Sequence, residues 1–157
     1  QVLAALCKGV SLKPTAADLN QPEAILPAAA PHDLAVFIAA ENRVEVGTFT
    51  DRGILDRLAP EQTAPWRQLD LAYIHRYLID ELVTKQALGG TAPKIQYVKL
   101  ATETIRLARE TDGIALLTKP CTMEQLRAVS HANDLMPQKS TFFYPKLATG
   151  LVVNPLE

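Results

Sequence analysis

The sequence predicts an α/β fold: a mixed sheet of about five strands, formed by one antiparallel hairpin plus strand–helix–strand units and covered by helices. Three observations predict it. Two apolar runs flank a short polar turn near residue 42, as in a hairpin. A strongly periodic helix follows over residues 68–85. Beyond it, short apolar runs alternate with amphipathic stretches, which is the order expected of strands joined by helices.

Composition limits the classes of protein to consider. The 157 residues are 48% hydrophobic and 21% charged, which fits one globular domain. The formal net charge of −1 argues against a nucleic-acid or anionic-membrane partner held by bulk charge. No apolar run approaches the roughly 20 residues of a membrane span. We therefore expect neither a membrane nor a nucleic acid as partner.

The two cysteines, Cys7 and Cys121, lie far apart, and no Cys/His cluster has zinc spacing. We predict no metal site and expect a reduced, cytoplasmic setting. The sequence names no cofactor. Cys121 stands just before an expected helix N-terminus, where a thiol pKa can be lowered, but one cysteine without a placed base is weak support for a nucleophile.

The chain begins at Gln1, and the apolar stretch that follows resembles the end of a helix. Residues 8–31 contain Gly9 and four prolines and are predicted to be irregular. We expect residues 1–31 to be a connecting segment from an upstream module, and residues 32–157 to be a single α/β domain. On this interpretation the chain is the C-terminal part of a longer protein, and residues before Gln1 complete any site.

The first predicted elements form the hairpin. Residues 34–39 form one strand and residues 44–50 the return strand, with Asn42 suited to positive φ in the turn. Residues 51–59 are expected to form one or two helical turns, and Trp66 is expected to anchor the following loop to the core.

In the helix of residues 68–85, one apolar stripe has spacings of four, three and four; it comprises Leu71, His75, Leu78 and Leu82. After it we predict a strand at residues 94–98, a helix at 101–109 and a strand at 114–117 buried on both faces. Thr122 and Gln125 form a capping-box pattern that starts another helix. The last predicted strand is residues 150–153, and parallel neighbours should cross over right-handedly.

The closing stretch, residues 136–156, has the composition of a site, with lysines, hydroxyls, adjacent aromatics and prolines. Lys139 followed by Ser140 and Thr141 resembles the end of a phosphate loop, but the glycines that should precede the lysine are missing, so that assignment fails. A looser anion site formed with Lys146 remains open. The alternative is that Lys139 is solvated while the two hydroxyls cap a turn.

Two further residues could belong to such a site. Tyr144 would either form a pocket wall or pack in the core. His75 could do acid/base work, although a histidine on an apolar helix face is more often a satisfied core residue.

The closing stretch also carries a family resemblance. Residues 136–147 read Met-Pro-Gln-Lys-Ser-Thr-Phe-Phe-Tyr-Pro-Lys-Leu, and Thr-Gly-Leu-Val follows at 149–152. This resembles the C-terminal signature of domain-of-unknown-function family ten-fifteen, a family of uncharacterised bacterial and archaeal proteins, whose usual form is Met-Pro-Pro-Lys-Ser-Thr-Tyr-Phe-Tyr-Pro-Lys. Gln138 and Phe142 depart from it mildly. Shorter segments at 69–75, 95–97 and 115–129 resemble the family as well, so the resemblance spans about residues 30–157.

The resemblance implies a longer protein that carries an upstream Asp-Gly-His-His-Arg motif, absent here. That motif is similar to one in the partition-protein and sulfiredoxin-like superfamily, which includes nucleotide-binding proteins and a free-serine kinase. Two functions follow as hypotheses. In the first, the chain is part of a protein that binds a nucleotide or phosphorylated small molecule, as a phosphotransferase would. In the second, it is a non-catalytic structural or docking module that packs on the upstream domain.

In the first hypothesis the site residues have assigned roles. Lys139 and Lys146 would neutralise phosphate charge, while Ser140 and Thr141 would hydrogen-bond the phosphate. Tyr144 would shape the pocket, and His75 would be an outside candidate for acid/base catalysis. In the second hypothesis the prolines and aromatics of the same stretch would form a rigid interface.

Overall fold

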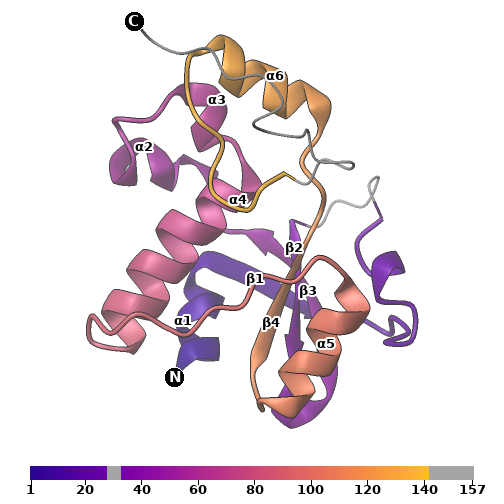
Figure 1. The fold of residues 1–157 in the computed structure, drawn as a ribbon. Coiled ribbons are helices and arrows are strands. Elements are labelled where there is room, and N and C mark those ends of the chain that lie inside the picture. The colour runs from indigo at the N-terminus through magenta and orange to yellow at the C-terminus, as the bar shows by residue number, and fades with distance from the viewer. Residues whose placement is uncertain (28–32, 142–157) are drawn as a thin grey trace, which may run out of the picture.

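The computed structural model describes residues 1–27 and 33–141 (Figure 1). One four-stranded sheet forms its centre, in the order β1-β3-β2-β4, and every neighbouring pair is antiparallel. The strands are β1 (Val10–Pro14), β2 (Leu34–Ile38), β3 (Arg43–Phe49) and β4 (Ile114–Thr118). The fold mixes helices and sheet as predicted, but a mixed sheet of about five strands is wrong for the described residues in both strand number and direction. The predicted strand 150–153 lies outside them.

Helices surround the sheet. The main ones are α1 (Val2–Gly9), α4 (Asp70–Tyr73) with its continuation η4 (Ile74–Ala87), α5 (Ala101–Glu110) and α6 (Met123–His131). Shorter turns are η1 (Pro22–Ala24), η2 (Ala39–Glu41), η3 (Arg52–Ile54), α2 (Leu55–Leu58) and α3 (Ala64–Arg67). None of the helices in the described ranges is long and apolar enough to cross a bilayer.

The hairpin is confirmed. Strands β2 and β3 pair from Leu34 opposite Gly47 to Ile38 opposite Arg43. Asn42 in the connection has φ of 44°, in the left-handed region that asparagine tolerates. Every residue of β2 is buried, because this strand lies between β3 and β4 with a core on each face.

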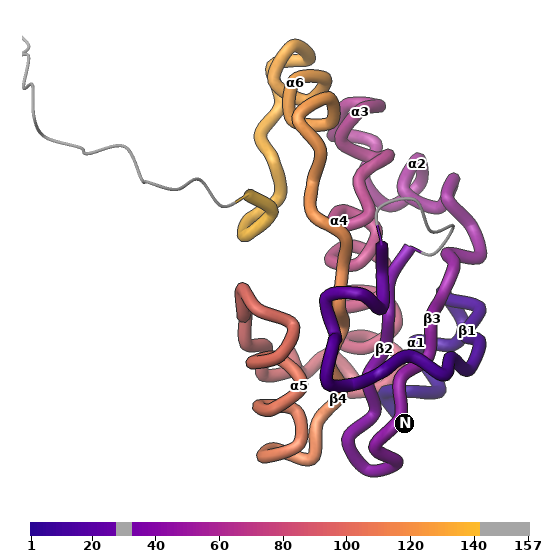
Figure 2. The backbone as a smooth tube through the Cα atoms, turned by 90° about the vertical axis from the view of Figure 1, so that its right-hand side faces the viewer, coloured from indigo at the N-terminus to yellow at the C-terminus, as the bar shows by residue number. Residues whose placement is uncertain are grey.

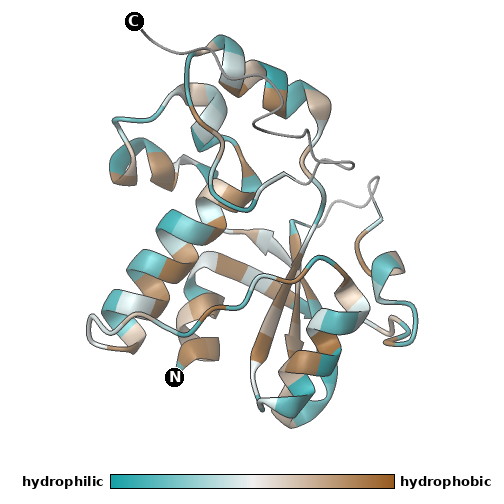
Figure 3. Ribbon diagram, in the orientation of Figure 1, coloured by the Kyte–Doolittle hydropathy of each residue, from teal (hydrophilic) through white to brown (hydrophobic). Residues whose placement is uncertain are grey.

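The two cores explain the helix arrangement. On one face, side chains such as Leu34, Val36 and Ile38 pack with α1, α4 and η4. On the other face, Ala35 and Phe37 pack with the buried side of α5. Alternation along β2 therefore supplies both cores at once. Figure 3 shows the apolar strands in the middle and mixed polar and apolar sides on the flanking helices.

Strand β1 is a correction, because residues 8–31 were expected to be irregular. Val10–Pro14 pairs with β3 from Val10 opposite Phe49 to Pro14 opposite Glu45. Val10 is buried and Leu12 is partly buried, while Ser11 between them and Lys13 after them are exposed, so a short period-two pattern is present. Pro14 is tolerated because β1 is an edge strand.

The segment 94–98 is the opposite correction. It was predicted to be a strand, yet it pairs with no described residue and crosses the surface between η4 and α5. The helix and strand after it are confirmed as α5 and β4, but β4 runs antiparallel to β2. The expected parallel strand–helix–strand unit is therefore not formed within the described residues.

The long helix has its core residues rotated from the predicted stripe. Leu78 and Leu82 are buried, but Leu71 and His75 are only partly buried. Ile74, which was predicted to widen the stripe, is buried, and so is Val83. The segment η4 has π-helical hydrogen bonding, which places more residues in each turn and turns a stripe spaced for an α-helix away from the core.

The short helices α2 and α3 and helix α6 gather at one end of the molecule, beyond the sheet (Figure 2). Trp66 of α3 is buried there, as predicted. Helix α6 starts with the predicted capping box: the Thr122 hydroxyl accepts from the Gln125 backbone N–H (3.1 Å), and the Gln125 side chain accepts from the Thr122 N–H (2.9 Å).

Candidate functional site

The candidate site begins with the closing loop, residues 132–141, which returns from α6 past α3 and α4. Asp134 fixes its start by accepting hydrogen bonds from the Thr63 backbone N–H (2.9 Å) and hydroxyl (2.8 Å). The bond from the Thr63 backbone is the main reason that the pKa of the Asp134 carboxyl lies below its usual range. The loop is thereby tied to the first turn of α3.

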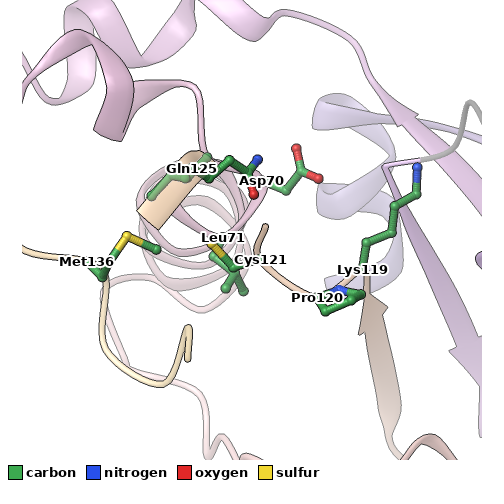
Figure 4. Close-up of a pocket in the computed structure, with 8 residues that line it drawn as sticks. Asp70, Leu71, Lys119, Pro120, Cys121, Gln125 and Met136 are labelled. Atoms are coloured by element: carbon green, nitrogen blue, oxygen red, sulfur yellow. The ribbon is translucent and has the colours of Figure 1, made fainter. Parts of the chain in front are cut away.

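Two residues after Asp134, Met136 lines a small pocket at the beginning of α4. The other lining residues come from three segments: Leu69, Asp70, Leu71, Lys119, Pro120, Cys121 and Gln125. Figure 4 shows Asp70, Leu71 and Cys121 between Met136 on one side and Lys119 on the other. The cavity is about 20 Å³, which is room for one water molecule. Ligand pockets for nucleotide-sized molecules are far larger, on the order of 300–1,000 Å³.

Asp70 at this pocket is already paired with an arginine. The Arg52 guanidinium donates to the Asp70 carboxylate (2.7 Å) and also to Asp33. The second oxygen of Asp33 accepts the Phe49 backbone N–H at 2.6 Å, and the guanidinium lies over the Phe49 ring at 4.6 Å. Arg52 therefore joins the end of β3 to the start of α4. Asp70 serves this connection rather than standing free as a base.

Cys121 does not have the properties of an activated nucleophile. Burial raises the pKa of the Cys121 thiol, and the negative charge of Asp70 raises it further. Its sulfur lies near the backbone carbonyl of Thr122, at 3.5 Å. Position before a helix N-terminus would by itself have the opposite effect, so burial and the carboxylate outweigh it here.

His75 is partly buried, and its ring stacks on Tyr97 with centroids 5.8 Å apart and planes 18° apart. Burial lowers the pKa of His75, and the nearby charge of Asp80 opposes this in part. The histidine is therefore mainly neutral near pH 7. It neither lies in the sheet core nor forms a hydrogen bond or ion pair with Lys139 in the described part of the chain.

The predicted phosphate-binding residues lie on a turn at the end of the described chain. Lys139 is exposed and has φ of 61°, in the left-handed region. The Ser140 hydroxyl donates to the backbone carbonyl of Pro137, so its proton closes the turn. Thr141 is exposed. Tyr144 and Lys146, the other two predicted binding residues, lie outside the described residues.

None of the four described site residues that the sequence predicts, His75, Lys139, Ser140 and Thr141, lines either of the two cavities found in the described part of the chain. Leu71 and His75 lie four residues apart along one helix, where Leu71 lines the Met136 pocket and His75 lies under Tyr97. Sequence reasoning missed the Asp33–Arg52–Asp70 group and the lining role of Lys119. No local motif marks them, because they meet only when four distant segments pack together.

Other candidate sites in the described ranges are sparse. No three His, Cys, Asp or Glu side chains there come close enough to hold a metal ion. An open groove of about 250 Å³ lies between α1 and the end of η4, lined by Gln1, Ala4, Ala5, Lys8, Gln86 and Ala87. One hydrogen bond, from Lys8 to Gln86 (2.9 Å), crosses it. The groove does not lie at the closing loop.

Comparisons with protein-family models, with curated proteins and with solved structures give no match for this chain. The resemblance to domain-of-unknown-function family ten-fifteen therefore remains a prediction from residues 136–147 and the shorter segments that accompany them.

Proposed function

We propose that this chain is the C-terminal part of a protein that binds a nucleotide or a phosphorylated small molecule, as a phosphotransferase does, and that Lys139 contacts the phosphate. The observation behind the proposal is the conformation of Lys139. A residue with a side chain pays about 1 kcal/mol or more to adopt left-handed φ, where glycine would pay little. Strained residues of this kind cluster at ligand-binding turns.

The chemistry of the turn fits an anion in part. The ammonium group of Lys139 is exposed and supplies charge, and the Thr141 hydroxyl is exposed beside it. Ser140 would have to exchange its bond to the Pro137 carbonyl before donating to phosphate. The roles of Tyr144 and Lys146, as pocket wall and second cation, continue the proposal into residues outside the described ranges.

The pocket next to the turn cannot hold the ligand by itself. Its volume of about 20 Å³ admits a water molecule and no phosphate. The proposal therefore places the phosphate on the surface of the turn, with the rest of the ligand held by other residues of the protein. His75, mainly neutral near pH 7, keeps its outside role as a base in this proposal.

The test replaces Lys139 by glycine. Lys139→Gly removes the amine and also relieves the left-handed strain. Binding of phosphate should therefore weaken, while the free energy of unfolding should stay the same or rise. We expect calorimetry with ATP and with inorganic phosphate to show at least about tenfold weaker binding. Urea denaturation should show unchanged stability, or a gain of about 0.5–1 kcal/mol.

Lys94→Ala is the matched control, because Lys94 is another exposed lysine and is not part of the closing loop. It should bind both ligands as the unmodified chain does. Equal binding by the unmodified chain and Lys139→Gly, or no binding by either, would reject the assignment of Lys139.

A second candidate function is a docking module. It is favoured by the exposure of large apolar side chains on one surface segment: Ile95, Tyr97 and Leu100 are 40%, 54% and 55% exposed. Isolated exposed apolar residues are ordinary, but three within six residues of one surface segment indicate an interaction surface.

A further inference from the structure

Leu135 in the closing loop is the most exposed large apolar side chain among the described residues. It is 84% exposed, and Met123 and Leu100 follow at 60% and 55%. The loop is fixed at this point, because the preceding Asp134 accepts the Thr63 backbone N–H and hydroxyl at 2.9 and 2.8 Å. The Leu135 N–H itself donates to the Asp134 carboxylate at 2.8 Å. A side chain held out in this way loses little loop freedom when another molecule buries it.

One exposed leucine is ordinary by itself, so its meaning depends on a surface that fits it. The groove between α1 and the end of η4 is such a surface, with a volume of about 250 Å³. A cavity of roughly 150 Å³ already admits a benzene-sized group, so the groove has room for a leucine side chain. It is smaller than the pockets of roughly 300–1,000 Å³ that hold drug-sized ligands. Alanine methyl groups form its apolar part and three longer polar side chains complete the lining: Ala4, Ala5 and Ala87, with Gln1, Lys8 and Gln86.

The charges beside the leucine and beside the groove are opposite. Lys8 at the groove is exposed, donates to the neutral side-chain amide of Gln86 at 2.9 Å, and forms no ion pair with a described carboxylate. Asp134 beside Leu135 accepts only from neutral groups in the described part of the chain. An approach that seats Leu135 in the groove places this carboxylate and the Lys8 ammonium in one interface, where they attract each other.

The leucine and the groove lie at opposite ends of the molecule. Thr63 ties the start of the closing loop to α3, which gathers with α2 and α6 beyond one end of the sheet. Helix α1 and the far end of η4 lie at the other end (Figure 1, Figure 2). Leu135 therefore cannot enter the groove of its own chain. A contact between two copies through these different surfaces is heterologous, and its repetition gives a ring or an open chain.

We propose that this chain associates with itself head to tail, with Leu135 of one copy seated in the α1–η4 groove of the next copy. The contact consists of one apolar side chain and a polar rim, so it is small and the association is weak, with a Kd on the order of 0.1 mM. This inference goes beyond both proposed functions and needs neither the phosphate site at Lys139 nor the apolar residues around Ile95.

Sedimentation of the whole chain over a range of concentrations measures the association, with a reducing agent present because Cys7 on α1 is exposed. Leu135→Ser removes the apolar side chain and Ala4→Trp fills the groove, and each should weaken association at least about tenfold. The matched controls make the same replacements at other exposed positions, Leu100→Ser and Ala16→Trp. Both controls should associate as the unmodified chain does, and circular dichroism should show that all four variants are folded.

A mixture of the two disruptive variants tests the head-to-tail arrangement. Leu135→Ser keeps an intact groove and Ala4→Trp keeps Leu135, so one complete contact can form between them. Near the Kd of the unmodified chain, each variant alone should be monomeric. Their mixture should form a one-to-one complex with the affinity of the unmodified contact and nothing larger, because no further leucine and groove remain to extend it.

The charge beside the groove has a test of its own. Lys8→Glu should weaken association about threefold, as expected for one exposed charge. Lys13→Glu is the matched control, because Lys13 is exposed, changes the net charge equally and does not line the groove. It should leave the association unchanged.

The proposal is overturned if the unmodified chain stays monomeric at ten times the expected Kd, if Ala4→Trp associates normally, or if the mixed variants form no complex. Loss of association in Leu100→Ser would also overturn it, in favour of the surface around Leu100 as the contact between copies.

Discussion

At the scale of single residues, Arg52 joins several distant segments of the chain, and no sequence motif indicated this role. Its guanidinium contacts two carboxylates from different segments, Asp33 and Asp70, and lies over the Phe49 ring. The Asp33 side chain is 14% exposed and the Asp70 side chain 25%, while Arg52 is 49% exposed. The carboxylates are shielded and the arginine is half in solvent, so the pairing is worth more than an ordinary surface ion pair.

Replacement of Arg52 should therefore destabilise the fold. Arg52→Met leaves two partly buried carboxylates without their cation, and we expect a loss of about 1–2 kcal/mol in urea denaturation after allowance for exposure. Arg52→Lys should lose part of this, because an ammonium cannot fork between two carboxylates. The matched control is Arg57→Met, whose pair with Asp51 is exposed and 3.5 Å long, and which should change stability by less than about 0.5 kcal/mol. Equal losses for Arg52→Met and Arg57→Met would contradict this role.

His75 predicts a pH dependence. Its pKa is lowered in the folded chain mainly by burial, so the unfolded chain binds more protons between the folded pKa and about 6.5. The stability from this group is present above pH 6.5 and is lost as the pH falls through the folded pKa. Titration by NMR should show the lowered pKa of His75, and Tyr97→Ala should bring that pKa back toward its ordinary value by exposing the ring. No response to Tyr97→Ala would show that the stacking does not provide the burial.

Some residue-scale features could be predicted because they are local. Asn42 in the turn and the pair Thr122–Gln125 at a helix start use hydrogen bonds and backbone angles within four residues. The state of Cys121 could not be predicted in the same way. The pKa of its thiol depends on Asp70, which is 51 positions away in the sequence, and on burial, which only the complete fold provides.

At the scale of elements, the close packing of β1 on β3 depends on Gly47. A Cβ at this position would lie 2.3 Å from Val10 Cγ1 and 2.9 Å from Leu12 Cδ2. Both side chains belong to β1, and Val10 is buried. The glycine therefore lets the edge strand lie flat against its neighbour.

Gly47→Ala should force Val10 or the backbone of β1 to shift, at a cost of about 1–3 kcal/mol in thermal or urea denaturation. Gly53→Ala is the control, since a Cβ there meets only the Asp51 carboxylate at an ordinary 3.4 Å. Hydrogen exchange in Gly47→Ala should rise first in β1. Wild-type stability of Gly47→Ala would show that β1 can move away without cost.

The elements themselves show where local patterns suffice. Helix α5 follows from apolar periodicity, and its predicted inward residues Ile105 and Ala108 are buried. Strand β4 follows from an unbroken apolar run that was expected to be buried on both faces, but only Ala115 and Leu117 are buried while Ile114 and Leu116 are partly buried. Residues 94–98 have equal strand character, yet they form no strand in the described fold. A segment becomes a strand only when a neighbouring segment supplies its hydrogen bonds, and no local pattern specifies that neighbour.

At the scale of the whole molecule, the first fourteen residues belong to the main core. Leu6 and Val10 are 3% and 1% exposed and pack in the same cluster as Tyr73 and Leu78. Tyr73 also donates a hydrogen bond to the Gly9 carbonyl (3.0 Å). The assignment of residues 1–31 to an upstream connecting segment remains a prediction, and this packing makes it testable.

A chain that starts at residue 15 would lose α1 and β1. Burial of Leu6 and Val10 alone contributes roughly 1.5–3 kcal/mol each, against a total stability of about 5–15 kcal/mol for a domain. Loss of the edge strand adds to this, so we expect the shortened chain to show no cooperative unfolding transition by circular dichroism. Leu6→Ala is the milder control, with an expected loss of about 2–4 kcal/mol. If the shortened chain kept the midpoint of the full chain, residues 1–14 would be a connecting segment after all.

The sequence by itself determined the hairpin, the two amphipathic helices that became α5 and α6, and a strand at 114–117, because each depends on side-chain spacing or backbone angles over a few residues. The tertiary structure alone decided the rest: which strands pair, the antiparallel direction of β4, the inclusion of β1 and the exposure of residues 92–99. The tertiary structure also decided the Asp33–Arg52–Asp70 group and the Met136 pocket. Pairing and packing join residues far apart in the chain, and their free energies depend on partners that a local pattern does not name.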